Sequence, residues 1–394
     1  MPSSENHLHV GVLLILVNVA LFALLPILRS EAPGPDSSKS FYTVTDGRLW
    51  MRADSVLQTV ASSRALFDRI IAERKVLFLG TSESGYAGNL CEQFNHLDPA
   101  APPMVKVARG GLSPIHSTLV FSRAADARVA FPPLVIIVNL VYFTRSHDVI
   151  NDGWLGNAVP SPVFAQFDLP RTLNTDVRDA YARHFAGRKL IHPVWLLQYV
   201  ANLVYLRFHR GVPALPEGVP LGVPTYVFDG IRPHYDERLG IHPGHVSIDR
   251  FSRARWEVVP AEDSLNLKAL RNSVEILRRQ PAPVLLLILP MNRRFYAHFG
   301  MDMVEFDRRF ARIRGAIRAM ADAPPFHVLD LYDVPPLDFG FFDRMHADPY
   351  GNFQLARYII GTDVYASFVR AVRAFYDGRS ATTSYARSSR SIFP

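Results

Sequence analysis

Three side chains of the types that cooperate in nucleophilic catalysis lie far apart in this sequence. Ser82 follows the apolar run Val76–Leu79 within the segment GTSESG (80–85), and Asp343 and His346 lie three positions apart near the C-terminus. A histidine takes the proton from an attacking serine hydroxyl, and an aspartate holds that imidazole in the required tautomer. Ser82, His346 and Asp343 are therefore the candidate catalytic residues.

Each of these two segments is weak evidence alone. A Ser in a turn after a strand commonly caps a helix. The segment is not a P-loop, because no Gly-Lys-Ser/Thr follows, and Ser84 replaces the second Gly of a G-x-S-x-G elbow. Together they predict one site, because a Ser after the first strand and an Asp-x-x-His after the last can meet at one sheet edge.

Other reactive side chains are weaker candidates. Cys91 is expected to be a small buried apolar residue. His242 and His245 are separated by Pro-Gly without a third ligand, so we expect two loop histidines, no metal site and no cofactor. Three residues beyond the third predicted strand, without an assigned role, are placed to line the site: Asp148, Asp152 and Trp154.

Short apolar runs alternate with helical patterns and predict the elements that position these residues. Runs without polar alternation are typical of parallel strands buried on both faces. The predicted strands are Val76–Gly80, Leu134–Val138, Val284–Leu289 and Phe326–Leu331, with Met104–Ala108 as a weaker fifth. The predicted helices are Ser113–Ala125, Ser264–Arg279, Met303–Ala321 and a final helix from Gln354 to Tyr376. This alternation predicts an α/β fold with helices flanking a parallel sheet.

The alternation is interrupted between residues 143 and 261. Pro and Gly are frequent there, and only two helices are predicted, Thr175–Phe185 and Val194–Phe208. The second is apolar and aromatic nearly all round, which fits either a buried helix or a helix docked on a membrane. We expect a mainly helical and loop insertion in one catalytic domain (66–376), followed by a flexible tail (377–394).

The N-terminal residues predict a membrane anchor (1–30) and a linker (31–65). Val10–Leu28 is an apolar run whose helical length of about 28 Å is close to the hydrocarbon thickness of a bilayer. A cleaved signal peptide is the alternative, but the preceding residues contain no Lys or Arg and the run is longer than usual. We therefore expect a single-pass protein whose catalytic domain is held at a membrane face.

Composition excludes some classes of protein. The formal charge is +7, yet no run of five or more basic residues occurs, so nucleic acid is not an expected partner. One Cys excludes an intramolecular disulfide framework and a Cys-based zinc site.

The candidate site resembles that of the SGNH (GDSL-like) hydrolase superfamily, whose nucleophile lies in a Gly-Asp-Ser block and whose Asp-x-x-His lies near the C-terminus. Gly80-Thr81-Ser82 stands in the first block, with Thr81 in place of Asp. The resemblance implies oxyanion donors at the glycine pair Gly110 and Gly111 and at Asn139. The Gly-x-Asn-Asp block of the superfamily is absent.

Further segments resemble the DltD family within this superfamily. They are the apolar N-terminus, Gly80-Thr81-Ser82-Glu83, Leu289-Pro290-Met291-Asn292 with Tyr296 and Gly300, and Asp343-x-x-His346 ahead of Gly351. The resemblance implies transfer of D-alanyl groups to cell-envelope polymers, beside a membrane-bound O-acyltransferase and an acyl-carrier protein. It also implies a bacterial cytoplasmic-membrane protein with an extracytoplasmic, periplasmic catalytic domain. A polysaccharide O-acetyltransferase or esterase, and a non-catalytic scaffold for the acyltransferase, remain alternatives.

Overall fold

The structure is a computed structural model that describes residues 42–51, 60–108, 112–150, 169–186, 215–241, 253–334 and 340–390. No helix within these ranges is long and apolar enough to cross a membrane. Several predictions lie outside the described residues: the anchor (1–30), the helix Val194–Phe208, the glycine pair Gly110 and Gly111, the histidine pair His242 and His245, and both Asp152 and Trp154.

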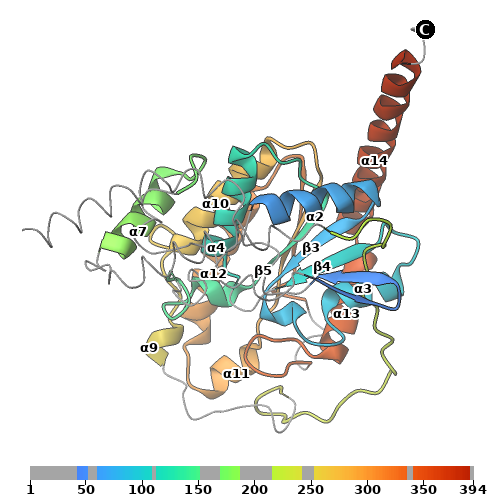
Figure 1. The fold of residues 1–394 in the computed structure, drawn as a ribbon. Coiled ribbons are helices and arrows are strands. Elements are labelled where there is room, and N and C mark those ends of the chain that lie inside the picture. Colours follow the sequence, from blue (N-terminus) through green and yellow to red (C-terminus); the bar gives the residue numbers. More distant parts are fainter. Residues whose placement is uncertain are drawn as a thin grey trace, which may run out of the picture.

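A five-stranded parallel sheet forms the centre of the fold (Figure 1), which confirms the predicted α/β class. Its strands are β3 (Val76–Gly80), β4 (Met104–Ala108), β5 (Leu134–Val138), β6 (Val284–Ile288) and β7 (Phe326–Asp330), in the spatial order β4-β3-β5-β6-β7. Every residue of β3, β5 and β6 is buried. Burial on both faces explains why these strands read as continuous apolar runs.

Helices cover both faces of this sheet. The first face packs against α2 (Val60–Ala72), α4 (Pro114–Asp126), α10 (Leu265–Arg278) and α12 (Met303–Met320). The second packs against α3 (Leu90–Leu97), α13 (Pro349–Ile360) and α14 (Asp363–Arg390). The apolar stripe of α10 explains its place, because Leu267, Leu270, Val274 and Leu277 are all buried.

Two predicted boundaries differ from the structure at the ends of the domain. The predicted linker (31–65) contains a hairpin of β1 (Tyr42–Thr45) and β2 (Arg48–Met51), and α2 begins inside it at Val60. The hairpin turn is Asp46-Gly47, and both residues have a positive φ. At the other end, α14 continues to Arg390, so helical backbone extends into the predicted tail (377–394).

The single final helix predicted from Gln354 to Tyr376 is wrong, because two helices occupy this region. Helix α13 starts earlier, at Pro349, and ends at Ile360. The N–H of the next residue, Gly361, bonds to the last carbonyls of the helix. Thr362 then starts α14, because its hydroxyl oxygen accepts from the N–H of Tyr365 (3.2 Å). A Gly-Thr pair therefore ends one helix and begins the next.

The insertion follows β5 and returns at α10. Its described parts are η2 (Leu140–Phe143), α7 (Thr175–Ala186), an irregular segment over 215–241, and the short helix α9 (Arg253–Trp256). The predicted helix Thr175–Phe185 is thus confirmed as α7. The segment 215–241 adds no strand to the five-stranded sheet, and its isolated bridges join it to the hairpin (Leu221 to Leu49) and to the loop before α13 (Ile241 to Phe341).

Strand order determines where a site can form. From β3 the chain passes to β4 on one side, whereas β5 lies on the other side of β3. In open parallel sheets, the carboxyl ends of two such strands diverge and leave a crevice in which ligands bind. Ser82 follows β3 and Asn139 follows β5, so both lie at this point of the sheet.

Candidate active site

The structure brings Ser82, His346 and Asp343 into one hydrogen-bonded chain. The Oγ of Ser82 lies 2.7 Å from Nε2 of His346. The Nδ1 of the same ring lies 2.7 Å from Oδ2 of Asp343. With the Asp343 carboxylate accepting from Nδ1–H, Nε2 is left as the acceptor for the Ser82 hydroxyl. This is the order of contacts that a serine nucleophile, a general base and an orienting acid require.

The turn that carries Ser82 is fixed by contact between its small residues. Ser82–Ser84 form the single 3-10 turn η1 directly after β3. A Cβ added to Gly80 would lie 2.0 Å from Oγ of Ser84, so only glycine allows this turn to fold back on the strand. The buried side chains of Thr81 and Ser84 then leave Ser82 as the member of the turn that faces His346.

The loop that carries Asp343 and His346 is held from two sides. The side-chain amide of Asn292, at the start of α11 (Arg293–His298), donates to the carbonyls of Asp343 (3.1 Å) and Leu239 (2.9 Å). On the other side, Gly340 and Gly351 are in backbone contact, and a Cβ on Gly351 would lie 2.2 Å from the Gly340 oxygen. The predicted motif residues Asn292 and Gly351 therefore position the loop of Asp343 and His346.

Hydrogen bonding sets the charge of the two loop residues. Burial alone would raise the pKa of Asp343, but the His346 ring and the N–H groups of Met345 and His346 hold that pKa below its ordinary value. Burial disfavours the His346 imidazolium, yet Asp343 and also Glu83 raise its pKa above 6.5, against the charge of Arg344. The arrangement thus favours the imidazolium form of His346.

Glu83 is a second acid beside the site, and the sequence reasoning assigned it no role. Its side chain is buried, its Oε1 accepts from Nδ2 of Asn139, and its Oε2 has no hydrogen-bond partner in the described structure. Burial raises the pKa of Glu83, while His346 opposes the rise. The sequence signal that could have indicated a role for Glu83 is its position: a charged residue directly after Ser82, at the end of a wholly buried strand.

Asn139, predicted as an oxyanion donor, makes hydrogen bonds to other protein groups in the structure. Its Oδ1 accepts from the N–H of Val141 (2.9 Å), which orients the amide, and its Nδ2 donates to Glu83. The residue is fully buried. Its position next to the site agrees with the expectation, but the contacts make it a partner of Glu83.

Tyr142 lies beside the nucleophile and was also missed. Its hydroxyl faces the hydroxyls of Thr81 and Ser82, which favour its ionised form, while burial and the charge of Glu83 raise its pKa. The net rise keeps the phenol neutral, so it remains a hydrogen-bond donor near Ser82 Oγ. A phenol of this kind can serve a developing oxyanion.

A small cavity lies under the turn, on the sheet face covered by α4 and α10. Its volume is about 20 Å³, room for one water-sized group. The lining is mostly apolar and comes from the ends of β3 and β5 and from both helices: Leu79, Gly80, Thr81, Leu112, Pro114, Ser117, Ile136, Ile137, Val138 and Leu270.

The remaining sequence candidates have structural roles. Cys91 is fully buried in α3, and burial raises its thiol pKa far above the ordinary value, so it is not a nucleophile. Asp148 accepts from the N–H groups of Leu265 (2.9 Å) and Asn266 (2.6 Å) and thus caps α10. Within the described ranges, no group of three or more His, Cys, Asp or Glu could hold a metal ion.

Comparison with known proteins gives no family to this chain: no protein-family model and no curated protein matches its sequence.

Proposed function

We propose that the protein is a serine acyltransferase that works through an acyl-enzyme on Ser82. The observation that carries this proposal is the hydrogen-bonded chain Ser82–His346–Asp343, with 2.7 Å at each step. Three residues around this chain hold it in position: Gly80 permits the tight turn of Ser82, and Asn292 and Gly351 hold the loop of Asp343 and His346. Such an arrangement fits acyl transfer or ester hydrolysis.

The reaction runs in two halves. His346 Nε2 takes the proton of Ser82 as Oγ attacks the acyl carbon of a donor ester or thioester, and the donor leaves with that proton. A hydroxyl of the acceptor, or water, then gives its proton to His346, attacks the acyl-serine, and releases Ser82 Oγ, which regains the proton. Backbone N–H groups of Ser82 and Gly111, with the Tyr142 phenol, are the proposed donors to the oxyanion.

The wider setting of the proposal comes from the resemblance to the DltD family. It includes an N-terminal anchor (1–30) in the bacterial cytoplasmic membrane and a periplasmic catalytic domain of the SGNH type. A D-alanyl or related acyl group would pass to an envelope polymer from a membrane-bound O-acyltransferase and its acyl carrier. The same chemistry with an acetyl donor, or with water as acceptor, gives a polysaccharide O-acetyltransferase or an esterase.

The test is covalent labelling of Ser82 together with turnover. The full chain should react with a fluorophosphonate and hydrolyse p-nitrophenyl acetate, and Ser82→Ala should abolish labelling and lower turnover by about 10³-fold or more. Ser84→Ala is the matched control, because Ser84 lies two residues away and its Oγ has no hydrogen-bond partner in the part of the chain that the structure describes. Labelling that persists in Ser82→Ala, or turnover that does not change, contradicts the proposal.

A further inference from the structure

Arg344, between the two catalytic loop residues, carries a guanidinium to which the described residues offer no hydrogen bond or ion pair. Its Nε is buried and makes no hydrogen bond, and in the described part of the chain it forms no ion pair. Its recorded contact is with an aromatic face, since its guanidinium carbon lies 4.2 Å from the ring centroid of Trp256. The buried Nε–H is a donor without an acceptor in the described structure, and an unsatisfied buried donor costs free energy.

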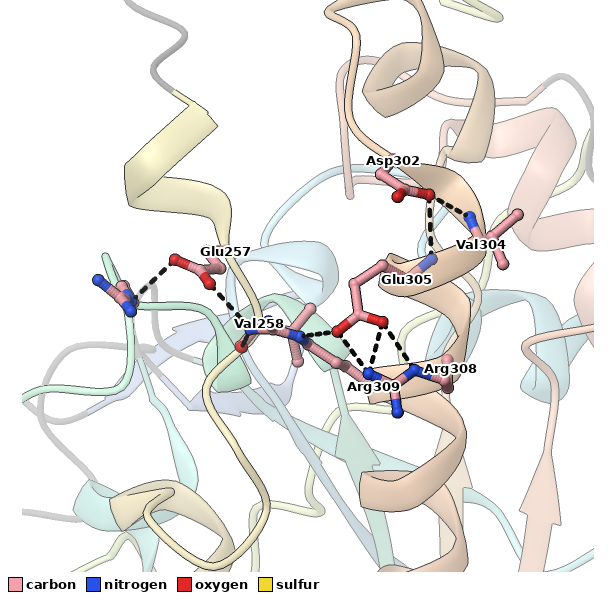
Figure 2. A network of polar contacts seen from close by, with 8 residues as sticks. Glu257, Val258, Asp302, Val304, Glu305, Arg308 and Arg309 are labelled. Atoms are coloured by element: carbon pink, nitrogen blue, oxygen red, sulfur yellow. Dashed lines mark hydrogen bonds and ion pairs between the residues drawn. The ribbon is translucent and has the colours of Figure 1, made fainter.

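The aromatic ring under Arg344 is held firmly. Trp256 ends α9, and the backbone on both sides of it pairs with the segment after β5: Ser146 N–H donates to Arg255 O (2.8 Å) and Arg145 N–H to Glu257 O (2.9 Å). Figure 2 shows the next layer, in which Arg309 of α12 bonds both Glu257 (2.9 Å) and the Val258 carbonyl (2.9 Å). Glu305 in turn holds Arg309 (2.6 Å). The ring is thus tied to the core helix α12.

The surroundings of Arg344 connect it to the nucleophile. The His147 ring lies 5.0 Å from Trp256 and 6.1 Å from Tyr142, whose hydroxyl faces Ser82. Burial and the charge of Arg344 lower the pKa of His147 to about 4, so it is neutral at pH 7. An aromatic row therefore runs from Ser82 to Arg344, and none of its members balances the positive charge.

We infer that Arg344, stacked on Trp256, is a binding site for an anionic group of the substrate, a carboxylate or a phosphate. Stacking leaves the edge of the guanidinium plane free for two parallel N–H···O bonds, which is how Arg recognises either oxyanion. The assignment of this anion to the acyl acceptor rests on the proposed function. The anion would fix the acceptor so that a neighbouring hydroxyl reaches the acyl group on Ser82.

The distribution of acids supports this assignment. Asp343 is the nearest carboxylate in sequence, but its oxygens accept from His346 Nδ1 and from the N–H groups of Met345 and His346. Two other partly buried arginines of the domain are paired with acids: Arg309 with Glu305 and Glu257, and Arg314 with Asp330. Arg344 differs from these in having its charge unmatched beside the catalytic histidine.

The experiment measures binding and does not require turnover. The full chain is titrated with inorganic phosphate and, separately, with D-glucuronate, and the heat of binding is recorded. We expect at least one of the two anions to bind, Arg344→Gln to weaken that binding about tenfold or more, and Arg344→Lys to give an intermediate value. Arg308→Gln is the matched control, because it removes the same charge from an exposed arginine paired with Glu305.

The outcomes separate this inference from the proposed function. Binding of phosphate alone indicates a phosphate-bearing acceptor, and binding of glucuronate alone a carboxylate-bearing one. Absence of binding to the unchanged protein, or equal binding to Arg344→Gln, overturns the inference. If Arg344→Gln does not fold, an undiminished affinity in Arg344→Lys overturns it instead. Ser82→Ala should retain binding, so a protein that binds the anion but never labels at Ser82 contradicts only the acyl-enzyme.

Discussion

The turn after β3 and the loop before α13 each bring one carboxylate towards His346, and their hydrogen bonding is opposite. Asp343 in the loop accepts from Met345 N–H (2.8 Å), His346 N–H (2.9 Å) and the ring Nδ1 (2.7 Å). Glu83 in the turn accepts from the side chain of Asn139, and its second oxygen is buried with no partner among the described residues. The pKa of Asp343 is lowered by its donors, and that of Glu83 is raised by burial.

The difference in hydrogen bonding gives the two carboxylates different roles, one as a constant charge and the other as a group that can gain and lose a proton. Asp343 is a permanent charge that orients the ring, because its donors remain in place whatever the state of His346. The described residues place no fixed cation beside Glu83, and among them the imidazolium of His346 is the charge that favours its ionised form. We therefore expect Glu83 to lose its proton as His346 gains one.

The largest effect is expected from removing the permanent charge. Asp343→Asn leaves the His346 ring without its acceptor at Nδ1 and favours the wrong tautomer, so p-nitrophenyl acetate turnover should fall about 10³-fold or more. Steady-state kinetics on the full chain measures this. Asp333→Asn, which removes an exposed carboxylate, is the control, and a similar loss in both variants would show that Asp343 has no special role.

A smaller effect is expected from loosening the loop without changing its charges. Asn292→Ala removes the donors to the carbonyls of Asp343 and Leu239 and should lower the free energy of unfolding by about 1–3 kcal/mol and turnover about tenfold. Denaturant unfolding and kinetics are measured together.

Asn272→Ala separates stability from position, because this buried residue bonds Thr118 (2.8 Å) and Ser122 (3.2 Å) between α4 and α10, away from the loop. It should lose comparable stability and keep its turnover. Equal losses of turnover in the two variants would assign Asn292 a purely structural role.

The smallest effect is expected from Glu83→Gln, and it concerns pH. Turnover requires neutral His346, whose pKa is raised, so the acid limb of the wild-type profile should have its midpoint above pH 6.5. The negative charge of Glu83 contributes to that rise, so the glutamine variant should move the midpoint to lower pH.

Glu92→Gln is the control for this shift. Glu92 lies on α3, is paired with Lys106 of β4 (2.7 Å) and makes no contact with His346. Its acid limb should coincide with that of the unchanged protein. If the acid limb of Glu83→Gln also coincides with that of the unchanged protein, Glu83 is neutral throughout catalysis.

The sheet was predictable because its strands are buried on both faces. β3, β4 and β5 match the predicted ranges residue for residue, and β6 and β7 end one residue earlier. The meeting of Ser82 with His346 and Asp343 was predictable for a related reason: parallel strands place their carboxyl ends, and the residues after them, at one edge. Local pattern and topology were sufficient for these features.

The neighbours of the candidate site were not predictable in the same way. The contact of Arg344 with Trp256 joins the last loop to the insertion, and no periodicity connects two such segments. The Glu83–Asn139 bond joins residues 56 positions apart. Asn139 was expected to face the substrate because the family resemblance assigns a role by position, whereas a buried carboxylate nearby competes for its amide.

The separation of Ser82 from His346 has a consequence for the life of the chain. These residues are 264 positions apart, one on the turn after β3 and the other on the loop between β7 and α13. Closing a loop of that length is slow relative to local structure, so we expect Ser82 to meet His346 only after the last strand has joined the sheet. A nascent or incompletely folded chain would thus hold an ordinary serine, so the proposed acyl transfer would begin only when assembly is complete.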